Sequence, residues 1–262
     1  SVVVPESLRD PLGYYRNNTM TTRNLLNVAI NCGVKRFIFS STAAVYGNPE
    51  QVPVPEQAPT RPLSPYGSSK LMTEIMLHDA ASAHDMKFVV LRYFNVAGAD
   101  PHARIGLATV GATHLLKIAV EAATGQRARI EVYGTDYPTP DGSCIRDFIH
   151  VSDLAQAHRA ALAHLRQGGD STTLNCGYGR GYSVLETIEA VRRVSGRQFA
   201  VQYAPRRPGD IMTMIADTSR IRSVLDWTPQ YDDLETIARH ALAWESKLIG
   251  ERAGSERRAV SA

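Results

Sequence analysis

The sequence predicts an α/β protein built on a doubly wound parallel sheet. Two apolar runs, at residues 37–39 and 88–91, have the length and composition of buried strands. A stretch with helical character lies between them, and a strand, a helix and a strand in this order form a βαβ unit with parallel strands. Strand-like and helix-like segments alternate to about residue 250, which is the pattern of an open α/β sheet.

Local signals along the chain predict the other elements. A helix is expected from about residue 11 to Cys32, because Gly33 is a favourable residue just past a helix end. Ser183 and Glu186 have the spacing of a capping box, which predicts a helix start. The remaining expected elements are helices at 65–83, 152–168 and 234–249 and strands at 173–176 and 199–203.

Loops and a tail complete the expected organisation. The loops at 48–65 and 134–143 are long and rich in proline and glycine, and long loops in compact domains often carry binding residues. The glycines at 177–181 superficially resemble a dinucleotide-binding turn, but their spacing is wrong, and we interpret them as a strand-to-helix turn that needs glycine dihedral angles. Residues 251–262 are polar, and we expect a disordered tail there.

The composition is that of an ordinary globular chain. Its 262 residues, 44% hydrophobic and 21% charged, can bury a large core in one or two domains. A net charge of +3 without a Lys/Arg block argues against nucleic acid, and no apolar run approaches the ~18 residues that a membrane span needs. Three widely spaced cysteines fit a cytoplasmic location, and the eight histidines lack metal-ligand spacing, so no metal is expected.

Tyr66 and Lys70 are the first candidates for chemistry. On a helix their spacing of four places both side chains on one face, one turn apart. A free tyrosine has a pKa of about 10, but a nearby ammonium or a nicotinamide cation favours the phenolate. Such a tyrosine can exchange a proton with a sugar hydroxyl. The pair alone is weak evidence, because this spacing arises by chance on many helix faces.

Polar groups follow both apolar runs. Ser40, Ser41 and Thr42 stand where the first strand is expected to stop, and residues 92–99 follow the second. In open α/β sheets, ligands bind beyond the carboxyl ends of the strands, so both segments lie where chemistry is expected. The alternative for the hydroxyls is a strand-end turn in which they cap backbone groups.

Seven segments taken in order resemble one known family; they are 14–18, 39–47, 64–70, 91–95, 133–142, 146–151 and 206–210. The chain is similar to the extended short-chain dehydrogenase/reductase family, and within it to the UDP-glucose (UDP-galactose) 4-epimerases. The resemblance runs from Pro5 to about Trp244. The ordered set is far more specific than any one motif.

The resemblance implies a Rossmann-type NAD-binding domain and a smaller α/β domain for a nucleotide sugar. We assign residues 1–96 and 152–176 to the first domain and residues 97–151 and 177–250 to the second. In the family, a Gly-rich turn after the first strand meets the cofactor pyrophosphate. No such turn lies near this N-terminus, and we expect that the chain is N-terminally incomplete and lacks the first βαβ units.

The activity implied by the resemblance is the NAD-dependent interconversion of UDP-galactose and UDP-glucose through a 4-keto sugar. Tyr66 matches the base that takes the 4-hydroxyl proton while C4 gives its hydride to the nicotinamide. Lys70 matches the residue that lowers the tyrosine pKa and bonds the nicotinamide ribose. Thr42 matches the hydroxyl residue that bonds the 4-oxygen. The cofactor-binding positions implied in this way are Asn17, Ser40, Ser41, Tyr66, Lys70 and Tyr93.

The resemblance also implies a set of substrate-binding residues. Arg146 and Arg207 match diphosphate ligands, and guanidinium forks pair well with phosphate oxygens. His114 stands where the family often has Asn, and either residue can donate to a phosphate. The full set comprises Thr42, Phe94 and Asn95 on the sugar and diphosphate side, His114, Tyr133 beside the uracil, Arg146, Arg207, and Asp210 at the ribose.

Ala43 and Ala44 favour a 4-epimerase over related enzymes that eliminate water or decarboxylate. Those relatives typically carry a carboxylic residue just after the Ser/Thr, which supplies a further proton carrier. A 4-epimerase for another UDP-sugar (UDP-N-acetylhexosamine or UDP-glucuronate) stays open. Met214 stands where a bulky residue narrows the sugar pocket in some family members and a small residue widens it, and the flexible methionine side chain is compatible with either. A truncated, non-catalytic nucleotide-sugar-binding fragment is the other alternative, because the cofactor's main anchor is missing.

The implied partners are a UDP-sugar and a second copy of the chain, with no nucleic acid and no membrane. Family members commonly form homodimers through two helices of each subunit, which assemble into a four-helix bundle. The helices at 11–32 and 65–83 are the candidates in this sequence.

Overall fold

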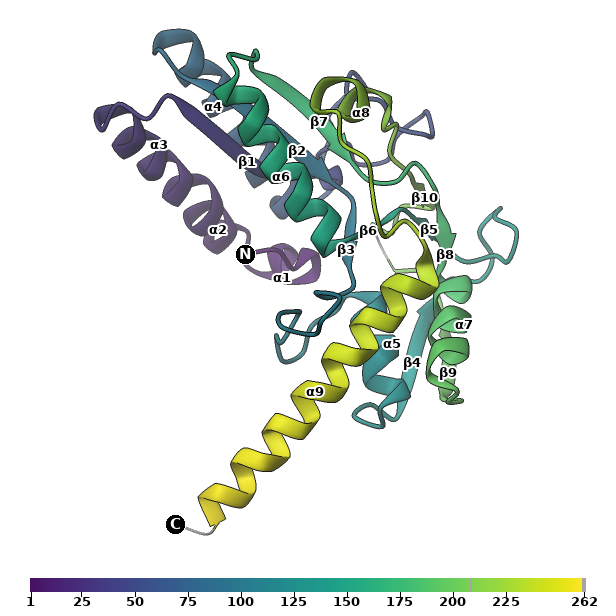
Figure 1. Ribbon diagram of the computed structural model, residues 1–262. Helices are drawn as coiled ribbons and strands as arrows, with labels where there is room; N and C mark the ends of the chain where they lie inside the picture. The colour runs from purple at the N-terminus through teal and green to yellow at the C-terminus, as the bar shows by residue number, and fades with distance from the viewer. Residues whose placement is uncertain (208, 261–262) are drawn as a thin grey trace.

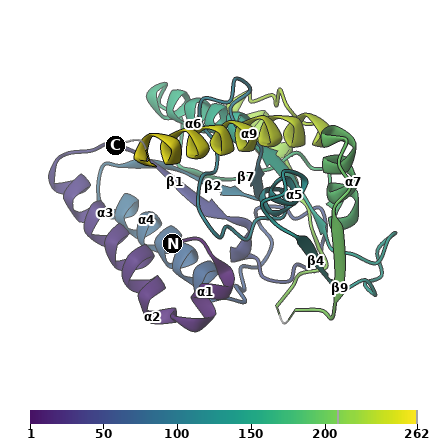
Figure 2. The same cartoon turned by 90° about the horizontal axis from the view of Figure 1, so that it is seen from below.

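The computed structural model describes residues 1–207 and 209–260. Its central feature is a parallel sheet in the order β1-β2-β7, formed by β1 (Arg36–Thr42), β2 (Lys87–Tyr93) and β7 (Thr172–Cys176). Helices α3 (Thr21–Asn31) and α4 (Pro65–Ala83) cover one face, and α6 (Val151–Arg166) covers the other (Figures 1 and 2). The predicted doubly wound α/β class is therefore confirmed.

The middle strand β2 is apolar on both sides because helices pack on both faces. Successive side chains of a strand point to opposite faces. One set packs under α3 and α4 in a cluster of Leu26, Phe39, Leu77, Phe88 and Val90. The other set packs under α6 in a cluster that includes Val89, Leu91, Ala157, Ala161 and Leu174. This explains why residues 88–91 form a continuous apolar run.

Smaller sheets follow at the carboxyl side of the main sheet. The pairs are β3 (Asn95–Ala97) with β6 (Phe148–His150), β4 (Arg129–Tyr133) with β9 (Ala200–Ala204), and β5 (Ile145–Arg146) with both β8 (Tyr182–Ser183) and β10 (Thr213–Met214). Helices α5 (Leu115–Ala123), α7 (Val184–Ser195) and α9 (Leu234–Val260) pack together in this region. Helix α8 (Ser219–Leu225) instead packs against α6 and β7.

The N-terminal region is helical. Helix α1 (Val4–Arg9) leads into α2 (Pro11–Tyr14), which continues through the π-helical segment η1 (Tyr15–Met20) into α3. The expected helix from 11 to 32 is thus present with one π-helical interruption, and Gly33 follows it at φ 70°. The capping box of Ser183 and Glu186 is also confirmed at the start of α7.

Two expectations are corrected. Strand β1 continues through the hydroxyl residues instead of stopping at Phe39, because its ladder with β2 extends to the pair Thr42–Tyr93. Helix α9 extends to Val260, so the tail predicted at 251–262 is wrong for residues 251–260; Glu, Arg and Ala are common in this stretch and are strong helix formers. Residues 261 and 262 lie outside the described residues. None of the helices described here combines the length and apolar character that crossing a bilayer requires.

Candidate active site

Helix α4 brings Tyr66 and Lys70 to the carboxyl end of β1. The helix starts at Pro65, and the Ser64 hydroxyl accepts a hydrogen bond from the Gly67 N–H at 3.2 Å. The first turn lies directly on the segment after β1, because a Cβ on Gly67 would come within 2.6 Å of the Ala44 oxygen. A glycine is therefore needed beside Tyr66.

Tyr66 is buried against Thr42. Burial raises the pKa of Tyr66 to about 12, and hydrogen bonding by Thr42 acts in the opposite direction. The Lys70 ammonium donates to the backbone oxygen of Ser40 at 3.0 Å, and burial lowers its pKa. The implied lowering of the tyrosine pKa by Lys70 is therefore not seen among the protein groups, and Thr42 is the residue that favours the phenolate.

Ser40 and Tyr93 lie together at the same edge. Burial raises the pKa of Tyr93, and a hydrogen bond with Ser40 acts in the opposite direction. The Ser40 Oγ is also 3.0 Å from Nε2 of His158 on α6. Because the Leu154 carbonyl, 2.8 Å from His158 Nδ1, can only accept, the Nδ1 carries the proton and Nε2 accepts the serine hydroxyl. Sequence reasoning missed His158, which no local pattern singles out.

Ser41 does not belong to this group. It is fully buried, and its hydroxyl donates to Glu74 Oε1 at 2.5 Å. Glu74 in turn pairs with Arg92, with 2.6 Å between Oε2 and Nη2. The prediction of Ser41 as a cofactor-binding residue is corrected, because its side chain points to the α4 face of the sheet. Sequence reasoning also missed Glu74, although it repeats the four-residue spacing of Tyr66 and Lys70.

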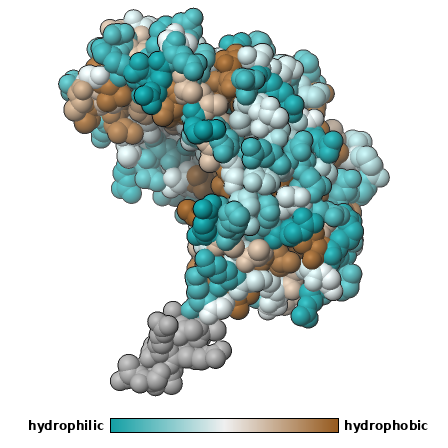
Figure 3. All heavy atoms as spheres, in the orientation of Figure 1, coloured by the Kyte–Doolittle hydropathy of each residue, from teal (hydrophilic) through white to brown (hydrophobic). Residues whose placement is uncertain are grey.

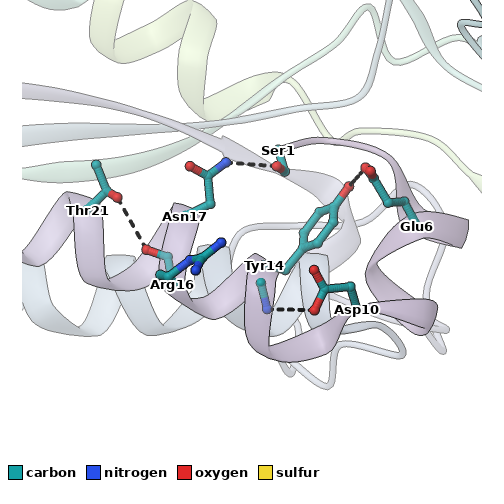
Figure 4. Close-up of a pocket in the computed structure, with 8 residues that line it drawn as sticks. Ser1, Glu6, Asp10, Tyr14, Arg16, Asn17 and Thr21 are labelled. Atoms are coloured by element: carbon teal, nitrogen blue, oxygen red, sulfur yellow. Dashed lines mark hydrogen bonds between the residues drawn. The ribbon is translucent and has the colours of Figure 1, made fainter.

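Asn17 lies in the π-helical segment η1, at the wall of a surface pocket of about 470 Å³. Figure 4 shows its amide beside Ser1, whose hydroxyl accepts a hydrogen bond from Nδ2 at 2.8 Å. The next residue, Asn18, is buried and donates to the Ser69 hydroxyl of α4 at 3.0 Å. Such π-helical segments occur frequently at functional sites. Asn18 anchors the segment to α4 and leaves Asn17 exposed.

A second group gathers three of the predicted nucleotide-binding residues. Tyr133 ends β4, and the guanidinium carbon of Arg207 lies 4.3 Å from its ring centroid. Arg207 also binds both carboxylate oxygens of Asp210, at 3.0 and 3.2 Å. Arg146 lies on β5, in a separate sheet, and donates to the oxygen of Met212 at 3.4 Å. The arrangement offers an exposed cation and an aromatic ring to an anionic, planar ligand.

The other predicted substrate residues lie outside both groups, in separate surroundings. Asn95 and His114 line a cavity of about 390 Å³ bounded by β3, α5 and α9. Phe94 is buried instead, in a cluster that also holds Met214 and Tyr46. The Phe94 and Met214 side chains thus belong to one packed cluster.

Comparison with known proteins assigns this architecture to a family. Residues 2–177 match the NAD dependent epimerase/dehydratase family. A UDP-glucose 4-epimerase of Azospirillum brasilense is 56% identical over 248 residues, which are 95% of this chain and 71% of the relative.

Solved structures agree. UDP-glucose 4-epimerase from Brucella ovis in complex with NAD has a TM-score of 0.90 at 43% identity, over 93% of this chain and 75% of that chain. The UDP-Glc/GlcNAc 4-epimerase from Campylobacter jejuni has a TM-score of 0.81 at 49% identity, over 94% of this chain and 75% of that one.

Proposed function

The chain belongs to the NAD dependent epimerase/dehydratase family, and we propose that it interconverts UDP-galactose and UDP-glucose through a 4-keto sugar with NAD as cofactor. The observation that carries this function is the buried Tyr66 hydroxyl held against Thr42 at the carboxyl end of β1. A tyrosine positioned beside a threonine hydroxyl can exchange a proton with a sugar hydroxyl. The chain has Ala43 and Ala44, without a carboxylate, where elimination would need another proton carrier.

The polar residues near the carboxyl end of β1 are suited to binding NAD. Lys70 uses one of its three N–H donors on Ser40 in the described part of the chain, which leaves donors for ribose hydroxyls. Tyr93 and the exposed Asn17 offer further polar groups. When bound, NAD supplies the hydride acceptor and a nicotinamide cation that lowers the pKa of Tyr66.

In the proposed reaction, Tyr66 takes the proton of the sugar 4-hydroxyl. Thr42 bonds the 4-oxygen and favours the phenolate form of the base, as it does in the free protein. The burial of Tyr66 keeps water away from the phenol, so the proton stays available for the return step.

On the nucleotide side, we assign the diphosphate to Arg146 and Arg207, the uracil to Tyr133 and the ribose to Asp210. Phosphate would replace the Asp210 carboxylate at the Arg207 fork, because both are bidentate acceptors. Residues 1–96 and 152–176 are proposed as the NAD-binding part and residues 97–151 and 177–250 as the nucleotide-sugar part. The separate small sheets of the second part support this division.

We assign a homodimer to the helical face formed by α2, η1, α3 and α4. This face exposes large apolar side chains at Leu12, Met20, Leu25, Val28, Met72 and Ile75. Part of it is visible as brown surface at the upper left of Figure 3. Contiguous exposed apolar residues mark interaction sites. A cytoplasmic location is supported by three free cysteines, because thiols persist in a reducing compartment.

The test is a cofactor-release assay followed by turnover. The purified protein is denatured, NAD in the supernatant is quantified, and UDP-galactose and UDP-N-acetylgalactosamine are offered to the native protein. Equimolar NAD and conversion of UDP-galactose are expected. A protein loaded with NAD that converts neither sugar contradicts the proposal, and a protein without NAD is the non-catalytic nucleotide-sugar-binding alternative. Conversion of the N-acetyl sugar alone assigns it to the other UDP-sugar class.

A further inference from the structure

One face of α4 contacts three consecutive residues of β1. The residues on the helix are four positions apart, so their side chains stack along a single face. The contacts join Tyr66 to Thr42, Lys70 to Ser40 and Glu74 to Ser41. The face therefore carries the Tyr66 hydroxyl at one end and the buried Glu74 carboxylate at the other.

Arg92 holds the Glu74 carboxylate from the neighbouring strand. The register of β1 and β2 places Arg92 beside Ser41, on the face that α4 covers. Its Nε lies 3.0 and 3.2 Å from the two carboxylate oxygens, and its Nη2 lies 2.6 Å from Oε2. Glu74 is 3% exposed and Arg92 is 7% exposed. The Glu74 carboxylate is thus held by residues of both β1 and β2, and its burial excludes solvent from these bonds.

The same guanidinium also fixes the segment that follows Thr42. Its Nη1 donates to the hydroxyl of Tyr46 at 3.0 Å and to the backbone oxygen of Glu56 at 3.2 Å. The Tyr46 hydroxyl donates in turn to Asn175 of β7 at 2.7 Å. One planar group therefore connects the helix of the base with the loop that begins at the end of β1.

We propose that Glu74 and Arg92 are positioning residues for the epimerisation, which set the Tyr66 hydroxyl against Thr42 without touching substrate or cofactor. This inference rests on the proposed function. A buried ion pair is a poor source of net stability, because desolvation offsets its attraction. A role in holding Tyr66 in position explains the ion pair better, since a displacement of about 1 Å at a reacting group costs roughly 100-fold in rate. Lysine would supply the charge of Arg92 without its planar fork.

Arg92→Lys in the NAD-loaded protein is the test, with Asp170→Asn as its matched control. Asp170 forms an exposed ion pair with Lys87, at 2.8 Å, at the other end of the same strand. We expect Arg92→Lys to lower kcat about 10- to 100-fold, while KM for UDP-galactose changes by less than about threefold. The kcat–pH profile should move to higher pH, because a looser Thr42 contact favours the phenolate less. The control should leave all three quantities unchanged.

Each other outcome overturns a stated claim. If Arg92→Lys lowers the melting temperature but keeps the parental kcat and pH profile, the pair is only structural and the inference is wrong. If the variant does not fold, Ser41→Ala decides, because it removes a single hydrogen bond to Glu74; an unchanged kcat and pH profile then overturns the inference. A parent protein that binds NAD but does not epimerise UDP-galactose overturns the proposed function, and this inference with it.

Discussion

The guanidinium of Arg207 stacks on the ring of Tyr133, with its central carbon 4.3 Å from the ring centroid, and binds Asp210 with two nitrogens. The preceding residue repeats the motif: Arg206 stacks on Tyr137 at 4.0 Å and pairs with Asp136. Two adjacent arginines thus sit in similar surroundings, and only Arg207 and its partners match the nucleotide-binding positions of the family. One arginine is therefore a matched control for the other.

Arg207→Lys is expected to raise KM for the UDP-sugar about 10- to 100-fold, because hydrogen bonds between charged groups contribute roughly 1.5–3 kcal/mol each. Arg206→Lys should leave KM within about threefold, because its partners are a surface carboxylate and a tyrosine outside the predicted set. Steady-state kinetics with UDP-galactose measure both. Equal effects of the two substitutions would remove Arg207 from the diphosphate site.

Tyr66→Phe is expected to lower kcat by roughly 10²- to 10⁴-fold, the usual contribution of a general base. The variant keeps the ring that packs at this edge, so bound NAD should be retained. Tyr203→Phe is the control, since Tyr203 is exposed on β9. Activity above a few per cent of the parent in Tyr66→Phe would mean that another group takes the proton.

Thr42→Val is expected to shift the kcat–pH profile to higher pH. Burial holds the pKa of Tyr66 at about 12, and hydrogen bonding by Thr42 lowers it, so loss of the hydroxyl raises it further. A base is active when deprotonated, and the valine variant therefore needs a higher pH for the same rate. Thr42→Ser keeps the hydroxyl and should keep the profile. Overlapping profiles for valine and serine would show that Thr42 does not act on the base.

Acid should weaken the protein through His150. This fully buried side chain lies with Nε2 3.0 Å from Nδ1 of His240, and its own Nδ1 accepts from the Ser152 N–H. Burial, then the charge of His240, lowers the pKa of His150 to about 4. A histidine in the unfolded chain titrates near pH 6.5. The difference between the two pKa values contributes about 3 kcal/mol to the unfolding free energy; this stability is fully present above pH 6.5 and is lost as the pH falls towards 4.

His150→Gln removes that contribution. The unfolding free energy of the parent should exceed that of the variant most at pH 7, and the difference should shrink towards pH 4 in denaturant titrations. Asp147, whose pKa burial raises to about 6, favours folding in the opposite pH direction, but it is present in both proteins and cancels in the difference. A difference that stays constant with pH would contradict the assignment to His150.

Leu25→Glu and Ile75→Glu should dissociate the proposed homodimer. Both side chains are exposed on the helical face, at 55% and 53%, and a buried unpaired carboxylate at a subunit contact is costly. Leu162→Glu on α6 is the control, because Leu162 is also exposed but lies on the opposite face of the sheet. Light scattering should give half the parental mass for the first two variants only. An unchanged mass would place the contact elsewhere.

Elements that depend on local pattern were predictable from the sequence. The apolar run at 88–91 lies in strand β2, as expected, and it is apolar throughout because both faces of the strand are covered. The capping box at Ser183 starts helix α7, as expected. Tyr66, Lys70 and Thr42 were named from family segments as candidate catalytic residues, and the structure places all three at the carboxyl end of β1.

The direction of each hydroxyl was not predictable. Ser40 and Ser41 are chemically identical, yet one faces His158 on α6 and the other faces Glu74 on α4. The direction of each side chain depends on which face of the sheet the first residue of β1 points to and on which helix packs on that face. Neither can be read from the residues of β1 alone. Residues 251–260 could not be assigned from the sequence either, because their polar composition suits both a disordered tail and the helix that is present.

The π-helical segment η1 gives the helix between Pro11 and Asn31 an unusual dependence on length. Each α-helical residue advances the chain by about 100° around the axis, so a wider turn changes the phase of everything beyond it. On one side of η1's centre Asn18 reaches Ser69, and further along Leu25 and Val28 face outwards. A return of η1 to ordinary α-helix at unchanged length would rotate these two faces against each other by about one residue's advance. The wide turn, and not any single side chain, therefore keeps Asn18 on Ser69 while Leu25 and Val28 face outwards.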